Sequence, residues 1–306
     1  MPHSAHRQRR PATRSLWRFL AISATETPTK SQLIKLARVF HTKKRLGQNF
    51  LVDPEVLSRI ADALSLKSTD CVVEIGPGLG FLTRFLAASS CRIIAVDLDR
   101  ECVEELEKCQ FTGVEIHHED FLQFDLGSVD SASIKVVGNV PYQITTPIVA
   151  RLFGEIGAPS PWISKIESVV MTVQKEVAER FVATPDNKNY SQITLLVNYF
   201  AEAELLEVIP KESFIPEPNV TSAVVRFKPY EKPPVDCSDH KLLRQIIRAG
   251  FKQRRKMLKN NLSFLNLSQD QLGVLLASLK IDPMVRAERL SLDQFAKITN
   301  AVNASR

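Results

Sequence analysis

Short apolar segments that alternate with amphipathic ones predict that residues 43–228 form a sheet flanked by helices. Apolar runs typical of buried strands lie at residues 71–75, 92–96, 114–117, 134–137 and 168–173. Helical patterns follow most of these runs and lie at residues 79–88, 100–109, 145–153 and 174–181. An earlier helix is expected to begin at Asp53-Pro54-Glu55, where an N-cap residue precedes a proline and an acid. This alternation favours a mainly parallel sheet with helices on both faces, of the Rossmann-like α/β class.

The pattern changes after the last of these helices. Two further strand patterns lie at residues 202–209 and 222–228. They are separated by the proline-rich segment Phe214–Pro218 and are expected to complete the sheet as an antiparallel pair. The stretch 229–238 is typical of a linker, and helical patterns beyond it lie at residues 240–251, 252–262, 268–279 and 292–301. We therefore predict an α/β domain over residues 41–230 and a smaller helical domain over residues 238–306.

Residues 1–40 have no clear apolar pattern, and structure is expected to begin just after them, near Lys43. The segment 1–48 carries eleven Lys/Arg and only one acid, a net charge of +10 within a formal total of +6. Such a segment is typical of a disordered basic arm, and the alternative is an organelle transit peptide. A second basic block, with eight Lys/Arg and no acid, runs from Lys241 to Lys259. Two concentrated basic segments on a mildly acidic remainder predict contact with a polyanion.

The composition is that of an ordinary globular chain, with 306 residues of which 44% are hydrophobic and 24% are charged. No apolar run reaches the roughly 18 residues needed to cross a membrane, so no membrane association is expected. The five cysteines include no C-x-x-C pair, which favours buried thiols in a reducing compartment over disulfides or a metal site. A cytoplasmic location is expected, or a plastid or mitochondrial one if residues 1–40 are a transit peptide.

A glycine-rich turn, Glu74-Ile75-Gly76-Pro77-Gly78-Leu79-Gly80, follows the first predicted strand. Glycines permit positive φ and close approach of a ligand, so Gly76 and Gly78 are candidate cofactor-binding residues. The turn lacks the G-x-G-x-x-G spacing of dinucleotide folds, which argues against NAD. Asp97 ends the second strand, where a carboxylate can accept hydrogen bonds from ribose hydroxyls. Asp120 ends the third strand, where a carboxylate can accept from the amino group of a cofactor's adenine.

The fourth strand leads into Asn139-Val140-Pro141-Tyr142, a pattern that suits an exocyclic amine on a planar ring. The Asn139 Oδ1 and the Val140 carbonyl can accept from that amine, while Tyr142 stacks on the base and Phe214 is a candidate second ring. Adenine N6 is a weak nucleophile, and acceptors on both N–H bonds would turn its lone pair toward the methyl group of S-adenosylmethionine (SAM). Positioning and oriented dipoles would supply most of the catalysis on a flipped base, without a metal ion.

Several motifs between residue 43 and about residue 300 match one known family. They are Lys43–Leu51, Glu74–Gly80, Asp120, Asn139–Tyr142, Phe214–Pro218, Ser222–Val225 and Phe251–Lys256. On these motifs the chain resembles the ribosomal RNA adenine dimethyltransferase family, in particular its bacterial small-subunit branch of the kasugamycin-resistance type. The resemblance implies that SAM is the cofactor and that it contacts Asn49, Leu51, Gly76, Asp97, Asp120 and Asn139. Family members often have Glu in place of Asp97 and Leu or Ile in place of Val140, so the Asp97 carboxylate reaches one methylene less far.

The family dimethylates two adjacent adenines in a hairpin loop near the 3′ end of small-subunit (16S) rRNA, and the resemblance implies the same target here. Catalytic roles are then expected for Asn139, Pro141, Tyr142 and Phe214. RNA phosphates are expected on Lys43, Lys44, Arg45, Arg248, Lys252, Arg254, Arg255 and Lys256. The protein would act as a monomer in ribosome biogenesis, on rRNA within an immature 30S-type particle. Two alternatives stay open: a large-subunit adenine methyltransferase of the macrolide-resistance type, and a non-catalytic assembly or transcription factor derived from the family.

Overall fold

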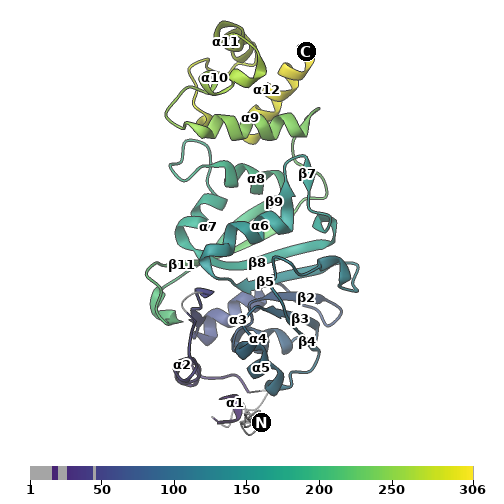
Figure 1. Cartoon of the computed structure of the whole chain (residues 1–306), viewed down its shortest axis with the longest axis vertical. Coiled ribbons are helices and arrows are strands. Elements are labelled where there is room, and N and C mark those ends of the chain that lie inside the picture. The colour runs from purple at the N-terminus through teal and green to yellow at the C-terminus, as the bar shows by residue number, and fades with distance from the viewer. Residues whose placement is uncertain (1–15, 20–25, 44–45, 306) are drawn as a thin grey trace, which may run out of the picture.

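The computed structural model describes residues 16–19, 26–43 and 46–305, and its centre is a seven-stranded sheet (Figure 1). The strands lie in the order β4-β3-β2-β5-β8-β11-β9. Their bounds are β2 Cys71–Ile75, β3 Arg92–Asp97, β4 Val114–His118, β5 Ile134–Asn139, β8 Ile166–Gln174, β9 Ala201–Ile209 and β11 Ser222–Pro229. The strands from β4 to β8 are parallel, and β11 runs antiparallel to both of its neighbours. The predicted Rossmann-like sheet and its final antiparallel pair are confirmed.

Helices cover both faces of this sheet. Their bounds are α3 Pro54–Asp62, α4 Phe81–Ala87, α5 Arg100–Cys109, α6 Thr145–Phe153, α7 Lys175–Phe181 and α8 Gln192–Phe200. Successive strand residues point to opposite faces, so Val72 packs in one cluster with α3, α4 and α5, whereas Val73 packs in another with α6, α7 and α8. Burial on both faces explains why these strands are continuous apolar runs in the sequence rather than alternating ones.

The C-terminal helices lie at one end of the molecule, beyond α8 (Figure 1). They are α9 His240–Lys252, α10 Leu258–Asn261, α11 Gln269–Ser278 and α12 Leu292–Ala304. Leu195 of α8 and Phe295 of α12 belong to the same buried cluster, so these helices share a hydrophobic core with the sheet. The predicted helix over residues 252–262 is wrong for most of its length, because a turn separates α9 from the single turn of α10. Among the described helices, none combines the length and apolar character required to span a membrane.

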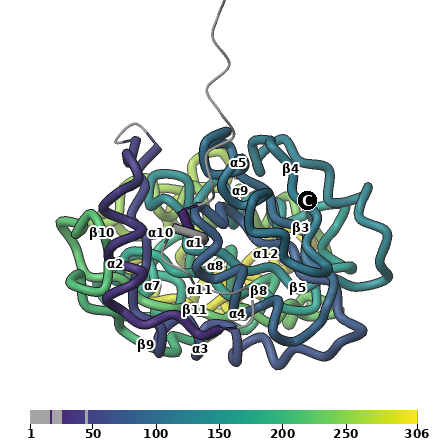
Figure 2. The backbone as a smooth tube through the Cα atoms, turned by 90° about the horizontal axis from the view of Figure 1, so that it is seen from below, coloured from purple at the N-terminus to yellow at the C-terminus, as the bar shows by residue number. Residues whose placement is uncertain are grey.

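Helix α2, Lys30–Val39, precedes the point at which the sequence predicts structure to begin. Thr29 caps it in a capping box with Gln32, which satisfies backbone donors at both positions. Its apolar face buries Leu33 in the same cluster as Phe50 of the short strand β1, Phe50–Leu51. Figure 2 shows α2 beside β10, Phe214–Ile215, which pairs with β1.

The short helix α1, Leu16–Phe19, also packs against the sheet domain. Trp17 is 3% exposed, and its indole Nε1 donates to the Leu79 carbonyl at 2.9 Å. The Trp17 ring lies edge-on to Phe81 with 5.6 Å between the centroids. The expectation that structure begins near Lys43 is therefore wrong, because residues 16–17 and α2 bury apolar side chains in the core that supports the glycine turn. Residues 1–15 and 20–25 of the predicted basic arm lie outside the described residues.

Candidate functional site

The glycine turn leaves open space beside the end of β2. Gly76 has a φ of +65° and Gly78 a φ of +58°, both in the region that side-chain-bearing residues avoid. A Cβ on Gly78 would lie 2.8 Å from the Phe50 ring, so only glycine fits there without a shift. A Cβ on Gly76 would meet nothing within 4 Å. The Gly76 backbone therefore faces room that a ligand can occupy.

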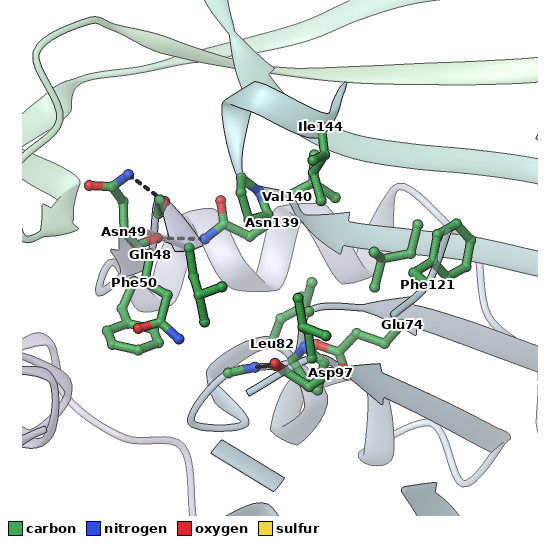
Figure 3. Close-up of a pocket in the computed structure, with 18 of the residues that line it drawn as sticks. Gln48, Asn49, Phe50, Glu74, Leu82, Asp97, Phe121, Asn139, Val140 and Ile144 are labelled. Atoms are coloured by element: carbon green, nitrogen blue, oxygen red, sulfur yellow. Dashed lines mark hydrogen bonds between the residues drawn. The ribbon is translucent and has the colours of Figure 1, made fainter. Parts of the chain in front are cut away.

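That room is a cavity of about 480 Å³ at the carboxyl ends of β2, β3 and β5, closed on one side by residues 46–51 (Figure 3). Most of the predicted site residues line it: Asn49, Leu51, Gly76, Gly78, Asp97, Asp120, Asn139, Pro141 and Tyr142. The carboxyl ends of parallel strands meet at one edge of a sheet, which brings these distant segments together. The cavity therefore joins the predicted cofactor residues to the predicted target-base residues.

Asp97 is 8% exposed, and its carboxylate is held by two backbone donors. The Gly78 N–H donates to Oδ2 at 2.9 Å and the Asp99 N–H donates to Oδ1 at 2.8 Å. Burial raises the pKa of Asp97 against the opposing effect of these hydrogen bonds. Each carboxylate oxygen keeps a second lone pair, so the buried Asp97 side chain retains the capacity to accept further hydrogen bonds.

Glu74 also lines the cavity, and the sequence analysis did not assign it to the site. It is 1% exposed, and the Thr83 hydroxyl donates to its Oε2 at 2.6 Å. Burial raises the pKa of Glu74 to about 8, and the nearby Asp97 adds to the rise. The signal was present in the sequence, because an acid inside a continuous apolar strand is rarely buried without a role.

The Asn139 amide has a fixed orientation. Its Nδ2 donates to the Asn49 carbonyl at 2.9 Å, and the Asn49 Nδ2 in turn donates to the Gly47 carbonyl at 3.0 Å (Figure 3). A backbone carbonyl can only accept, so it selects the Nδ2 end of the amide. The Asn139 Oδ1 is thereby turned away from Asn49 and is left as the acceptor of this side chain.

Tyr142 follows in a short 3₁₀ helix, Tyr142–Ile144, and is tied at its hydroxyl. The Tyr142 Oη lies 2.6 Å from the Oγ of Ser222, the first residue of β11. Burial raises the pKa of Tyr142, so the phenol stays protonated at neutral pH. The ring is therefore positioned by a residue eighty positions later in the chain.

The expected second stacking ring, Phe214, does not line the cavity. It is 2% exposed and pairs with Leu51 across the β1–β10 ladder, within the core cluster beneath the site. A ring with so little free surface cannot stack on a base in this arrangement. Phe214 is therefore not presented to the cavity in this arrangement, where its side chain supports the wall that Leu51 provides, and its contact with a base stays a prediction.

The predicted RNA-binding residues fall into three groups: residues with acidic or carbonyl partners inside the protein, residues outside the described part of the chain, and exposed residues. Lys43 is engaged by acids, since its Nζ contacts the Asp99 carboxylate and lies 3.2 Å from Glu101. The hydrogen bond that Lys43 donates to Asp99 raises the pKa of Lys43. Lys44 and Arg45 lie outside the described residues. Arg254 binds Glu288 at 3.2 Å and the Tyr190 carbonyl at 3.0 Å.

The third group is exposed and consists of Arg248, Lys252, Arg255 and Lys256. Arg248 and Lys252 lie on α9, and Arg255 and Lys256 lie in the turn that follows it. Their side chains make no ion pair within the part of the chain that the structure describes. The expected phosphate contacts of Lys43 and Arg254 are therefore weakened by internal partners, whereas these four cations are available to a polyanion.

Comparisons with known proteins identify the family of this chain. A sequence model of the family described as ribosomal RNA adenine dimethylase matches residues 39–304. The ribosomal RNA small subunit methyltransferase A of Caldanaerobacter subterraneus is 39% identical over 267 residues, which covers 85% of this chain and 97% of that protein. The protein of the same name from Geobacillus kaustophilus is 37% identical over 289 residues, with 90% and 96% covered.

Two solved structures share the fold. A dimethyladenosine transferase from Plasmodium falciparum superposes with a TM-score of 0.67 at 24% identity, and covers 82% of this chain and 96% of its own. The 23S rRNA methyltransferase ErmE superposes with a TM-score of 0.65 at 22% identity, with 83% and 99% covered. At these identities the likeness supports the fold alone, and the sequence match supplies the rest. The chain belongs to the ribosomal RNA adenine dimethylase family, whose members are SAM-dependent methyltransferases, and it is an rRNA adenine dimethyltransferase.

Proposed function

We propose that this protein dimethylates the N6 nitrogens of two adjacent adenines in the 3′-terminal hairpin loop of small-subunit rRNA, during subunit biogenesis. The observation that carries the proposal is the Asn139 amide, locked to the Asn49 carbonyl at 2.9 Å on the wall of the cavity that the glycine turn opens. The small-subunit target is supported by the names of the curated relatives, which are 37–39% identical to this chain.

The cofactor half of the cavity fits SAM. Gly76 leaves room for a ligand against the backbone, and Asp97 keeps acceptor capacity for a ribose. Asp120 would accept from the adenine amino group, while Asn49 and Leu51 would close the site from the 46–51 side. When bound, SAM supplies a methyl group that is electrophilic because it is attached to a positively charged sulfur. The carboxyl groups of Asp97 and Asp120 line the cavity and suit a ligand of positive charge, whereas burial keeps the Glu74 carboxyl protonated at neutral pH.

The other half of the cavity would hold the target base. The Asn139 Oδ1 and the Val140 carbonyl would accept from the two N–H bonds of N6, which orients the nitrogen lone pair toward the methyl group. The Tyr142 ring, fixed through Ser222, would stack on the base, and Pro141 would hold the turn between the two. These groups act by position and by fixed dipoles, and the surrounding walls exclude water from the nitrogen. A base in this pocket must have left its stack, which a hairpin loop permits at low cost.

The exposed cations of α9 and the following turn would hold RNA phosphates outside the cavity. Arg248, Lys252, Arg255 and Lys256 are the described residues best placed for this, and Lys44 and Arg45 are further candidates from the sequence. We further propose that the protein works as a monomer on an immature 30S-type particle, because both basic segments belong to one chain that carries a whole cavity.

The test is to incubate the protein with labelled SAM and with small-subunit rRNA, either naked or in immature subunits, and to analyse the digested RNA by mass spectrometry. We expect N6,N6-dimethyladenosine at two adjacent positions, which primer extension locates in the 3′-terminal loop. Asn139→Ala should reduce transfer by about 10²–10³-fold or more, because an oriented acceptor is lost. RNA affinity of this variant should not change, since the phosphate contacts lie elsewhere.

Each outcome separates the alternatives. Large-subunit rRNA is offered in a parallel incubation, and label there instead of in small-subunit rRNA would favour the macrolide-resistance type of target. Retained RNA binding with no methyl transfer by the unmodified protein would favour a non-catalytic factor. Transfer by the Asn139→Ala variant at the rate of the unmodified protein would refute the role given to Asn139.

A further inference from the structure

The loop between α2 and β1 carries a glutamine whose side chain is held at both ends. The Lys43 N–H donates to the Gln48 Oε1 at 2.8 Å, and the Gln48 Nε2 donates to the Asp99 Oδ2 at 2.7 Å. Gln48 lines the cavity and is half-buried. Its side chain therefore closes the loop on itself and fastens it to the turn that begins α5.

The turn that receives Gln48 also holds the cofactor half of the site. Asp99 is 2% exposed and caps α5 by accepting from the Glu101 N–H at 3.1 Å. Its own N–H donates to the Asp97 carboxylate at 2.8 Å. Burial alone would raise the pKa of Asp99, but hydrogen bonds from Lys43 and Gln48 outweigh it and lower that pKa. Asp99 is thus a fixed anion that Gln48 can use as an anchor.

The residues on either side of Gln48 lie against the Asn139 segment. The Asn49 carbonyl accepts from the Asn139 Nδ2 at 2.9 Å, and Gly47 has a φ of +63°. A Cβ on Gly47 would lie 2.4 Å from the Gln143 Oε1, so the loop is pressed against the segment that follows Asn139. Gln48 lies between these two residues, and its anchor sets where the Asn49 carbonyl points.

We propose that Gln48 is a positioning residue for methyl transfer, which orients the Asn139 amide through the Asn49 carbonyl and links that orientation to the Asp97 turn. The inference rests on the proposed function of Asn139. The two ends of an Asn amide have nearly the same shape, so only its hydrogen-bond partner decides which end meets the substrate. If the Asn49 carbonyl moves, the Asn139 amide can turn its NH₂ toward the N6 amine of the target base. One hydrogen-bond donor then faces another, and the lone pair of N6 is no longer directed toward the methyl group.

Two substitutions of Gln48 test this. Gln48→Leu removes both side-chain hydrogen bonds at similar size, and kcat at saturating SAM and RNA should fall about 10- to 100-fold, as expected for a misplacement of about 1 Å. Its affinity for RNA should not change. The matched control is Gln123→Leu, the same change at an exposed position outside the cavity, for which kcat should equal that of the unmodified protein. Rates are expressed per fraction of protein that binds SAM, so that partial unfolding does not imitate the effect.

The pH dependence of the activity of Gln48→Glu is a second test, because a residue with a merely structural role would not change it. A protonated glutamic acid can donate to Asp99 and accept from the Lys43 N–H as glutamine does, whereas an ionised one opposes Asp99. The charged or titratable groups facing position 48 are Lys43 on the loop and Asp99, Glu101 and Cys102 at the start of α5. The activity of this variant relative to the unmodified protein should rise several-fold as the pH falls from about 8 to about 6.

A Gln48→Leu variant with the kcat of Gln123→Leu would overturn the proposal, and so would a Gln48→Glu activity ratio that does not change with pH. If Gln48→Leu fails to fold, the pH profile of Gln48→Glu still decides. Failure of the proposed function can be told apart from failure of this Gln48 proposal, because in the first case the unmodified protein itself would transfer no methyl group.

Discussion

Replacement of Glu74 by glutamine should change how the stability of the cofactor-free protein depends on pH. Glu74 is 1% exposed in β2, and its side chain accepts a hydrogen bond of 2.6 Å from the Thr83 hydroxyl. Burial raises its pKa from 4.5 to about 8. In the unfolded chain the pKa returns to the ordinary value, so between these two values the folded protein holds a proton that the unfolded chain has released. Stability is therefore greatest below the unfolded pKa and is lost as the pH rises toward the folded one.

The size of this loss follows from the difference between the two pKa values. One pKa unit corresponds to about 1.4 kcal/mol, so the rise from 4.5 to about 8 corresponds to an upper limit of about 5 kcal/mol, of which about 3 kcal/mol is already lost at neutral pH. The group is almost fully buried, so no discount for solvent screening applies. Glutamine keeps the shape and the acceptor for Thr83 but carries no charge. Its buried NH₂ costs about 1–3 kcal/mol at every pH.

The measurement is denaturant unfolding of the unmodified protein and of Glu74→Gln across the range from about pH 5 to about pH 8.5. The glutamine variant should be equal or less stable at the acidic end and more stable at the alkaline end. The difference between the two free energies of unfolding should change by several kcal/mol, about 3–5, across the series. Glu231→Gln, at an exposed position, is the control and should run parallel to the unmodified protein. Parallel profiles for Glu74→Gln as well would show that burial does not hold Glu74 protonated.

Three further outcomes can be measured on other parts of the molecule. Ser222→Ala and Tyr142→Phe each remove the 2.6 Å hydrogen bond between Tyr142 and Ser222, so each should lower kcat/KM about tenfold. The double variant should lose no more than either single variant, and additive losses would contradict a shared role. Removal of residues 1–28 takes away Trp17 and should lower the thermal midpoint by several degrees, whereas removal of residues 1–15 should not; equal midpoints would contradict the docking of α1. Lys252→Gln and Arg255→Gln should each reduce the slope of log Kd for RNA against log salt by about 0.7–0.9, and unchanged slopes would place the phosphates elsewhere.

The sequence alone predicts which segments line the cavity better than it predicts which residues pack behind its walls. Strand ends in a parallel sheet meet at one edge, so the glycine turn, Asp97, Asp120 and the Asn139 segment had to converge once the strands were recognised. The sequence could not fix the register of β1 against β10. That register pairs Phe214 with Leu51 and turns the Phe214 ring into the core. In the sequence, Phe214 stands just before two prolines, a pattern that is typical of a loop.

The other differences arise where tertiary contacts override a local pattern. Helix α8 is not predicted from the sequence. It packs against β9 on one side and against α9 and α12 on the other, so its short apolar run also fits a buried strand. Lys43 belongs to a basic run that is typical of a solvated surface, yet folding brings Asp99 to it from 56 residues away. Trp17 lies between arginines in the sequence, and its burial follows from contacts with Leu79 and Phe81 at the start of α4. In each case the deciding partner lies far along the chain.

The distribution of charge on the protein favours different sites for the phosphates and for the target base of an RNA substrate. The cavity is lined by the carboxyl groups of Asp97 and Asp120, by the protonated Glu74 and, among its described lining residues, by no lysine or arginine. The exposed cations of α9 lie at the opposite end of the molecule from β2 and α4 (Figure 1). A phosphate is therefore attracted to the C-terminal helices and repelled from the cavity mouth, where carboxylates would face it in a medium of low dielectric. A neutral base whose amine donates hydrogen bonds meets no such barrier, because the Asn139 Oδ1 and the Val140 carbonyl are acceptors. Under the proposed function, the same electrostatics that suit a cationic methyl donor thus disfavour the RNA backbone in the cavity and favour the flipped base there.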